Sequence, residues 1–350
     1  MNKIFPIRLK QARIMHGLSM DALCGKANNA LSKQAISKYE SGKMMPDSKS
    51  LIVLSNALGV SIDYFFRPFS VSIENIEFRK KAKLQVKQLD SIREIIKDRL
   101  ERYFEIEELT GIAPEFCSAY SNVKIQEKSD IYPIVSRLKR DWKLGEDGIN
   151  NLIEILEENK IKVIEIDAPS SFDGLSGYVN GNSPIIVLNK NMESERKRFT
   201  ALHELGHLLL CFDESIEGKN VEKFCNLFAS EMLISKDVFI MKIGANRRDI
   251  SLLELIDIQI QFGISIDALM YKAKDLNIIT ESRYKTFIFK KNAACEFKRS
   301  VEKNRSKAEK SCRFARLVYR ALASEVISIS KASALLESPI EEIRSQLNLV

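Results

Sequence analysis

Two histidines four residues apart, with a glutamate directly after the first, are the residues of this sequence best suited to chemistry. They are His203, Glu204 and His207, within the run FTALHELGHLLL of residues 199–210. Positions i and i+4 share one face of a helix, so both imidazoles can bind one metal ion. Glu204 lies beside that ion and can accept a proton from water held there. The pattern predicts a hydrolytic site that binds one Zn²⁺ ion.

A hydrolytic zinc site needs a third protein ligand. The chain has only three histidines, and the third, His16, lies near the N-terminus; the six cysteines form no CxxC pair. A carboxylate from the predicted helix at 220–234 is therefore expected. Glu222 is favoured, because Asn226 lies one turn later and can hold a ligand imidazole from behind. Glu231 is the alternative.

Hydrolysis of a peptide bond also needs a hydrogen-bond donor for the developing oxyanion. With no further histidine available, the candidates are Tyr178, in a predicted strand at 177–179, and Arg198. Tyr178 is the predicted catalytic group, and its competing interpretation is an aromatic side chain that packs on the core. Arg198 could equally form a structural ion pair. A peptide substrate could add itself as a strand along the edge at 177–179.

The pattern around these residues is mixed and predicts an α+β, mostly helical chain with a small sheet. Strands are expected at 161–166, 177–179 and 185–188, and helices at 134–142, 151–158, 195–211, 220–234 and, broken at Gly263, at 249–278.

The set of motifs over about residues 130–280 resembles the ImmA/IrrE family of bacterial zinc metallopeptidases. The resemblance rests on the run Arg198–His207 and on Glu222-x-x-x-Asn226-x-Phe228-Ala229. It implies a zincin-like domain with a helical extension, in which His203, His207 and Glu222 are ligands and Glu204 is the catalytic acid/base. It also implies a protein substrate of the helix-turn-helix repressor type, in stress, phage or mobile-element control. One departure is Met232–Ser235, which lacks the proline that often ends the ligand helix in this family.

Residues 5–66 predict a compact set of short helices, the second and third of which are capped by Ser19 and Ser32. Its outward polar side chains suit the major groove of double-stranded DNA. Gln34 and Lys33 can contact base edges, whereas Lys38 and Lys43 can contact phosphates. The predicted DNA-binding residues are Ser32, Lys33, Gln34, Ser37, Lys38 and Lys43.

The segment 32–43, followed by Pro46, resembles the recognition helix and turn of the Xre/Cro/C1 repressor family, and this resemblance implies an operator as partner. The preceding turn, Asn28–Leu31, is longer than usual for that family. A helical protein-interaction module is the competing interpretation.

Charge and hydropathy limit the classes of protein to which this sequence can belong. The net charge is +7, and residues 281–320 carry 13 basic and 4 acidic side chains. Such a basic stretch can bind nucleic acid, but a solvated helical face is the favoured interpretation. No apolar run approaches the ~18 residues of a membrane span, and no secretory signal is visible. We therefore expect a cytoplasmic protein without a membrane partner.

The chain divides into four predicted regions. These are a helix-turn-helix domain at 1–68, a helical linker at 69–129, a zinc metallopeptidase domain at 130–285 and a basic helical region at 286–350. The long helix expected at 74–110 is a spacer or the contact of a homodimer. Together the regions predict a DNA-binding transcriptional regulator with zinc endopeptidase activity toward a repressor or toward itself. The alternative is a non-proteolytic repressor or antitoxin whose zinc domain senses a signal or binds a partner.

Overall fold

The structure, a computed structural model, describes residues 3–71, 84–112, 116, 123–293 and 309–347. It divides into two compact units, which are considered one at a time. The terminal unit contains described residues 3–71, 84–112 and 312–347, and the central unit contains residue 116 and residues 123–293 and 309–311. The predicted C-terminal region 286–350 is therefore not one piece, because its last helices belong with the N-terminal part of the chain. Within the described residues, no helix combines the length and apolar character needed to cross a membrane.

The N-terminal part of the terminal unit is a bundle of short helices around a core that includes Phe5, Leu9, Ile36, Leu54 and Phe65. Side chains of Ser19 and Ser32 accept hydrogen bonds from backbone N–H groups in the first turns of α2 and α3, as the sequence predicted. The helices are α1 Ile4–Met15, α2 Met20–Lys26, α3 Lys33–Glu40, α4 Ser48–Leu58 and the 3-10 helix η1 Ile62–Phe66.

The long helix α5, Val86–Thr110, is covered along part of its length by the C-terminus of the same chain. Tyr103 and Ile106 share a core with Leu317, Val318 and Leu335. The C-terminal helices are α15 Arg313–Ala323, α16 Ile329–Leu336 and α17 Ile340–Leu347. Three helices this short cannot build a core alone, so they bury their apolar faces against α5. The expected start of the long helix at 74–83 lies outside the described residues, and the homodimer stays a prediction.

Buried charges connect α5 to the N-terminal helices. Glu101 lies 2.7 Å from Arg8 and 2.9 Å from Arg67, and Asp98 forms ion pairs with Arg67 and, at 2.8 Å, with Arg102. Burial opposes the ionisation of Asp98, but the two arginines outweigh it and lower the pKa of this carboxyl. The network therefore stabilises the terminal unit when Asp98 is charged.

The central unit contains both sheets of the described chain. Its three-stranded sheet has the order β2-β4-β3, with β2 parallel and β3 antiparallel to β4, so β3 is an edge strand. Asn180 and Gly181, both with positive φ, form the turn between β3 and β4. A second, two-stranded sheet pairs β1 with β5 in parallel. The strands are β1 Lys124–Ile125, β2 Lys162–Ile166, β3 Gly174–Val179, β4 Ser183–Asn189 and β5 Cys211–Phe212.

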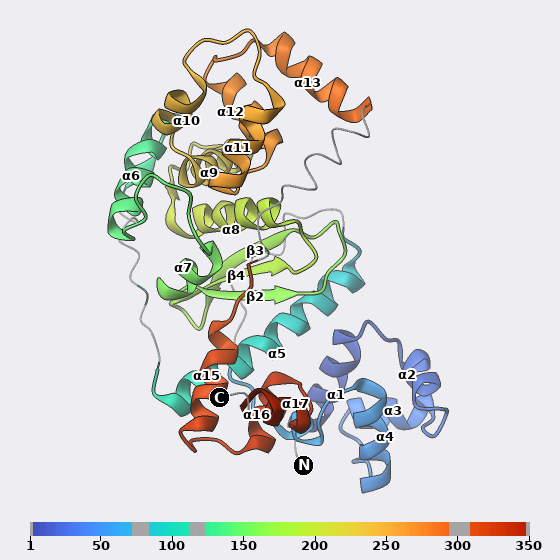
Figure 1. Cartoon of the computed structure of the whole chain (residues 1–350). Coiled ribbons are helices and arrows are strands. Elements are labelled where there is room, and N and C mark those ends of the chain that lie inside the picture. The colour runs from blue at the N-terminus through green and yellow to red at the C-terminus, as the bar shows by residue number, and fades with distance from the viewer. Residues whose placement is uncertain (1–2, 72–83, 113–115, 117–122, 294–308, 348–350) are drawn as a thin grey trace. The chain divides into compact units, whose positions relative to one another are not determined.

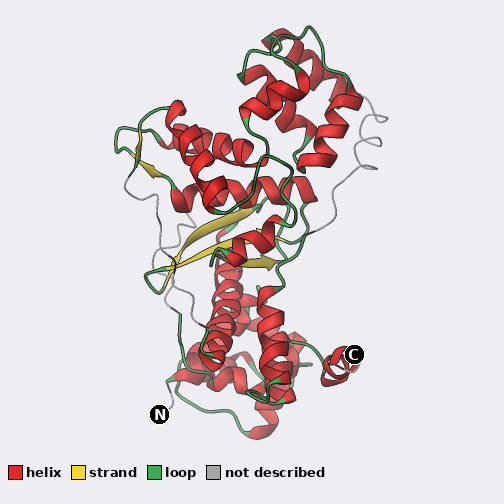
Figure 2. Ribbon diagram, turned by 60° about the vertical axis from the view of Figure 1, so that its left-hand side comes forward, coloured by secondary structure: helices red, strands yellow, loops and turns green. Residues whose placement is uncertain are grey.

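Helix α8 lies between the three-stranded sheet and the helices that follow it (Figures 1 and 2). Its Ala201, Leu202 and Leu205 are buried in one core with strand residues and with α9. The helices of this unit are η3 Lys128–Asp130, α6 Ile131–Asp141, α7 Leu152–Glu158, α8 Ser194–Leu209, α9 Gly218–Leu233, α10 Lys236–Ile243, α11 Leu252–Phe262, α12 Ile266–Asp275 and α13 Glu281–Ala293. The expected α+β, mostly helical class is confirmed, whereas β1, β5 and α10 were not predicted. The two-residue strands are too short for any alternation to show.

Candidate metal centre and nucleic-acid interface

Helices α8 and α9 bring His203, His207 and Glu222 together, as their spacing predicted. The two Nε2 atoms are 3.1 Å apart, and they lie 3.2 Å (His203) and 3.6 Å (His207) from carboxylate oxygens of Glu222. Among the described residues, these three form a group that could hold a metal ion. In a tetrahedral zinc site, metal–ligand distances of about 2.0–2.2 Å place neighbouring ligand atoms about 3.3–3.6 Å apart. The donor set and its spacing therefore fit zinc.

Asn226 lies behind the first ligand and orients it. The Nδ1–H of His203 donates to Oδ1 of Asn226 at 2.9 Å. This bond selects the tautomer in which the lone pair of Nε2 points into the ligand group. The alternative ligand Glu231 lies elsewhere: it is buried, forms an ion pair with Lys272, and accepts a hydrogen bond from the backbone N–H of Lys236 at 2.8 Å. Of the two carboxylates considered, only Glu222 joins the histidines.

Gly206 allows the two ligand-bearing helices to approach each other. It follows His203 by three residues and so faces α9. A Cβ atom at this position would lie 3.3 Å from the ring of Phe228 and 3.4 Å from Cys225. Cys225 is fully buried at this crossing. The close crossing places Glu222 opposite the histidines.

Glu204 is buried on α8 and bonded to the neighbouring edge strand. Its Oε2 accepts a hydrogen bond from the hydroxyl of Ser176 at 2.8 Å. Ser176 was not among the predicted site residues. The sequence nevertheless contained a signal for it, because Ser176 and Tyr178 are two residues apart in a strand and their side chains therefore point to the same face of the sheet. The structure places both of their hydroxyls against α8.

The two candidates for the oxyanion donor are engaged in other bonds. The hydroxyl of Tyr178 donates to the carbonyl of Leu208 at 2.9 Å, and burial raises its pKa. Arg198 is buried, forms an ion pair with Glu309, and donates to the carbonyl of Ile149 at 2.8 Å. The hydroxyl proton of Tyr178 thus anchors β3 to the end of α8, and the predicted role as oxyanion donor would require this bond to be exchanged. Arg198 has the structural role that the sequence left open.

In the terminal unit, α3 presents the predicted DNA-binding face. Ile36 and Tyr39 are buried, whereas the six predicted contact residues are exposed. Lys33 is 2.7 Å from Asp21 in an exposed ion pair, so it must exchange this partner to contact a base. Among the described residues, no carboxylate pairs with Gln34. Of these two side chains, Gln34 is therefore the better placed for direct contact with a base edge.

Comparison with known proteins identifies both parts of the chain. Residues 156–274 match the model of the IrrE N-terminal-like domain, and residues 9–65 match that of the helix-turn-helix. The chain joins a helix-turn-helix domain to an IrrE N-terminal-like domain. Over 64 residues it is 39% identical to the SPbeta prophage-derived uncharacterized HTH-type transcriptional regulator YonR of Bacillus subtilis (strain 168). That match covers 18% of this chain and 57% of the relative.

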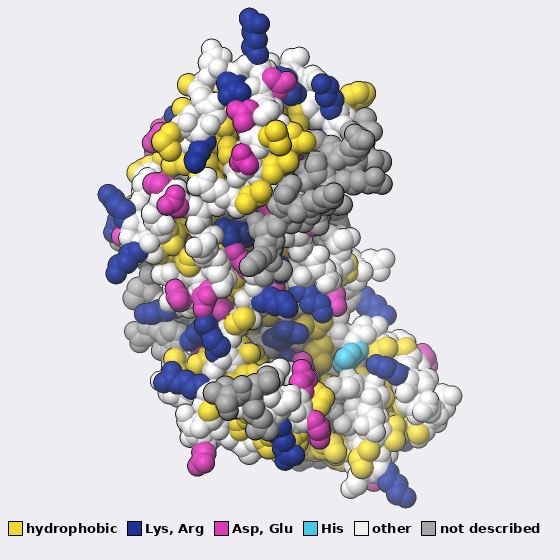
Figure 3. All heavy atoms as spheres, in the orientation of Figure 1, with side chains coloured by type: hydrophobic (Ala, Val, Ile, Leu, Met, Phe, Trp, Pro, Cys, Tyr) yellow, Lys and Arg dark blue, Asp and Glu magenta, His cyan; other side chains and the backbone are white. Residues whose placement is uncertain are grey.

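The helical extension of the IrrE-like domain shows no single basic patch on the face seen in Figure 3. Basic and acidic side chains lie interspersed over α10–α13 there. Phe287 of the predicted basic stretch is buried in the core of the domain, and Phe289 is exposed. Phe297 lies outside the described residues. The part of the stretch in α13 agrees with a solvated helical face, whereas in α15 Phe314 packs on the ring of Tyr103 and Arg313 pairs with Glu107 of α5.

The helix-turn-helix domain gives a testable division of roles between two side chains. We expect Gln34→Ala to weaken operator binding by about 1–3 kcal/mol and to relax the preference at one base pair. Lys38→Ala should weaken binding to all sequences alike and lower the salt slope by about one. Fluorescence anisotropy with operator and scrambled DNA over a salt series measures both. Lys242→Ala, which removes an exposed charge from α10, is the matched control and should change neither quantity.

Proposed function

We propose that this protein is a DNA-binding transcriptional regulator and a zinc-dependent endopeptidase that hydrolyses a peptide bond in a repressor-type regulatory protein. The observation that carries the proposal is the convergence of His203, His207 and Glu222, with Glu204 adjacent in sequence to one ligand. A DNA-binding role also implies action in the compartment that holds the DNA, the bacterial cytoplasm.

Each residue of the site has a distinct task in this reaction. His203, His207 and Glu222 would hold the metal, and Asn226 fixes the orientation of the His203 imidazole. A bound zinc ion supplies a Lewis acid that makes water a nucleophile near neutral pH. Glu204 accepts the proton of the attacking water at its carboxylate and passes it to the leaving amine. Ser176 donates to one oxygen of that carboxylate and holds it in place.

The edge strand β3 offers a way to bind an extended polypeptide. It pairs with β4 on one side, and in the described sheet no strand pairs with its other side. A substrate segment could add itself there by main-chain hydrogen bonds. We propose that the segment comes from a helix-turn-helix repressor or from a second copy of this chain, since the helix-turn-helix domain can bring both proteins to one operator.

The metal site is tested first by its stoichiometry. Protein purified without added metal should contain one zinc ion per chain. Glu222→Gln should lose it, because the amide removes the anionic ligand. Asn226→Ala should retain zinc with an affinity about 10- to 100-fold lower. Competition with a chromogenic chelator measures both variants, and Glu217→Gln, just before α9, is the control. A zinc content of zero in the wild type, or full zinc in Glu222→Gln, would contradict the ligand assignment.

The non-proteolytic alternative is kept because of one specific observation. The two expected oxyanion donors, Tyr178 and Arg198, are both committed to structural bonds. A domain that only binds zinc and a partner needs no such donor. In this alternative, the chain is a repressor or antitoxin whose zinc domain senses a signal, and removal of zinc changes DNA or partner binding without any cleavage.

A further inference from the structure

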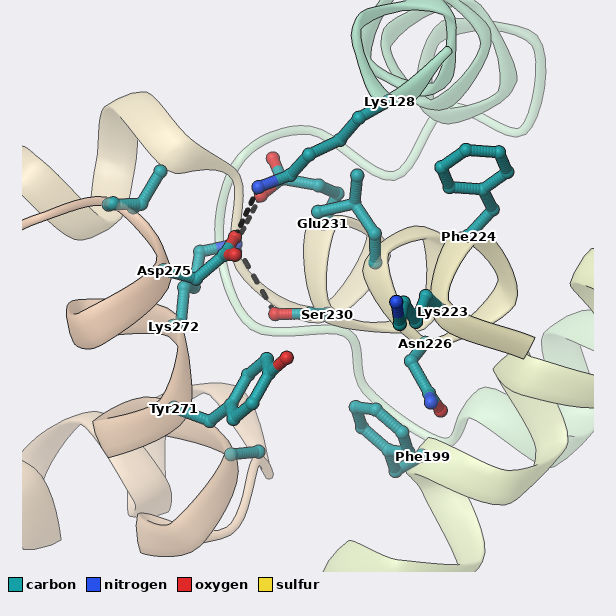
Figure 4. Close-up of a pocket in the computed structure, with 13 residues that line it drawn as sticks. Lys128, Phe199, Lys223, Phe224, Asn226, Ser230, Glu231, Tyr271, Lys272 and Asp275 are labelled. Atoms are coloured by element: carbon teal, nitrogen blue, oxygen red, sulfur yellow. Dashed lines mark hydrogen bonds and ion pairs between the residues drawn. The ribbon is translucent and has the colours of Figure 1, made fainter. Parts of the chain in front are cut away.

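A cavity of about 380 Å³ lies beside the metal-ligand group, between α8, α9 and α12 (Figure 4). Phe199, one turn before His203 on α8, and Asn226, one turn after Glu222 on α9, both line it. Asn226 is therefore shared: its amide oxygen holds the ligand His203 while its side chain borders the cavity. The volume is at the lower end of the range typical of ligand pockets.

The walls of this cavity are mainly apolar and aromatic. Figure 4 shows the rings of Phe199, Phe224 and Tyr271 around it, and Leu227 and Ala268 add aliphatic surface. Such a lining favours an apolar group. Burial of a side chain the size of leucine or phenylalanine corresponds to an affinity gain of about 10- to 100-fold.

Two ion pairs in the lining use charged groups that an occupant could otherwise meet. Lys128 and Asp275 form an ion pair, and the ammonium of Lys272 bonds to Glu231 and donates to the carbonyl of Ile234 at 2.8 Å. An occupant therefore needs no charge there. Lys223 and Asn226, by contrast, are exposed residues of the lining, which makes that part of the rim polar. A mainly apolar lining whose charged groups are paired or exposed suits an apolar side chain attached to a polypeptide backbone.

We propose that this cavity binds a large apolar side chain (leucine, methionine or phenylalanine) of the protein substrate, close to the scissile bond. The inference rests on the proposed function, since the metal site defines where the scissile bond lies. It adds to that function a determinant of substrate choice: segments with small or charged side chains at this position should be poor substrates.

Zinc-binding probes with and without a side chain test the proposal on the full-length, zinc-loaded protein. The probes are succinyl monohydroxamate and its isobutyl- and benzyl-substituted forms, and titration calorimetry measures their dissociation constants. In the wild type, the substituents should tighten binding by about 10- to 100-fold. Ala268→Phe, which fills the cavity, should remove this gain and leave the unsubstituted probe within twofold of wild type. Ala268→Leu should remove part of it.

Ala245→Phe is the matched control, because Ala245 is exposed and lies outside the cavity lining. It should keep the full gain. Equal affinities of all three probes in the wild type, or an unchanged gain in Ala268→Phe, would overturn the pocket assignment and leave the metal site standing. If the unsubstituted probe does not bind at all, the proposed metal site itself is wrong and the pocket inference falls with it. Binding that persists after zinc is removed would indicate a separate small-molecule site and would also overturn the proposal.

Discussion

Replacement of Glu204 by glutamine is expected to lower peptide-bond hydrolysis at least 100-fold, and up to about 10,000-fold, while zinc and DNA binding remain. Glutamine keeps the shape of the side chain and can still accept the hydrogen bond from Ser176, but it cannot accept the proton of water. The readout is mass-spectrometric profiling of new N-termini. Proteins of the source organism, and the chain itself, are incubated with zinc-loaded wild type or with Glu204→Gln.

The same experiment separates the two proposed functions. Under the endopeptidase proposal, a small set of new N-termini appears with the wild type and with Glu214→Gln, a control at an exposed acid beyond α8, but not with Glu204→Gln. If the wild type generates no such termini under any inducing condition, and yet binds zinc and DNA, the non-proteolytic alternative is supported. Turnover of short unstructured peptides would instead point to an aminopeptidase-like activity, which needs no edge strand.

Replacement of Asp98 by asparagine is expected to destabilise the terminal unit by about 3–5 kcal/mol. The change removes a buried negative charge that pairs with Arg67 and Arg102, and it leaves two guanidinium groups short of a partner. At 1.4 kcal/mol per tenfold, exchange of protected amides in α1 and α5 should accelerate roughly 100- to 3,000-fold. Hydrogen-exchange mass spectrometry of the full chain measures this unit directly, whereas the single tryptophan, Trp142, lies in the central unit.

The pH dependence of this effect has a definite sign. The pKa of Asp98 is lowered in the folded unit, so its contribution is fully present above the unfolded value near 3.9 and is lost as the pH falls through the folded value. The difference between wild type and Asp98→Asn should therefore be largest near neutral pH and shrink in acid. Asp90→Asn, at a half-exposed pair 3.7 Å from Arg93, is the control and should exchange like the wild type. Acceleration of less than about fivefold in Asp98→Asn would contradict the structural role of the network.

Local sequence patterns were enough to predict many features of the fold and of the candidate metal site. Helix periodicity alone makes His203 and His207 neighbours. Since the third histidine, His16, lies in the helix-turn-helix region and there is no CxxC pair, a carboxylate on the next helix is expected. Asn226 followed from the same periodicity, and the caps at Ser19 and Ser32 set the start of two helices. These features depend on residues within a few positions of each other, where the geometry of one helix is decisive.

What only the tertiary structure decided concerns contacts between residues far apart in the chain. Tyr178 and Arg198 had the right chemistry for an oxyanion donor, but their partners, Leu208 and Glu309, lie 30 and 111 positions away, and no local pattern reveals them. The same holds for the C-terminal helices on α5 and for the cavity between α8, α9 and α12. The role of a side chain depends on which groups lie next to it in the packed structure. Packing brings together segments that are far apart in the sequence, and the sequence alone does not show which of them will be in contact.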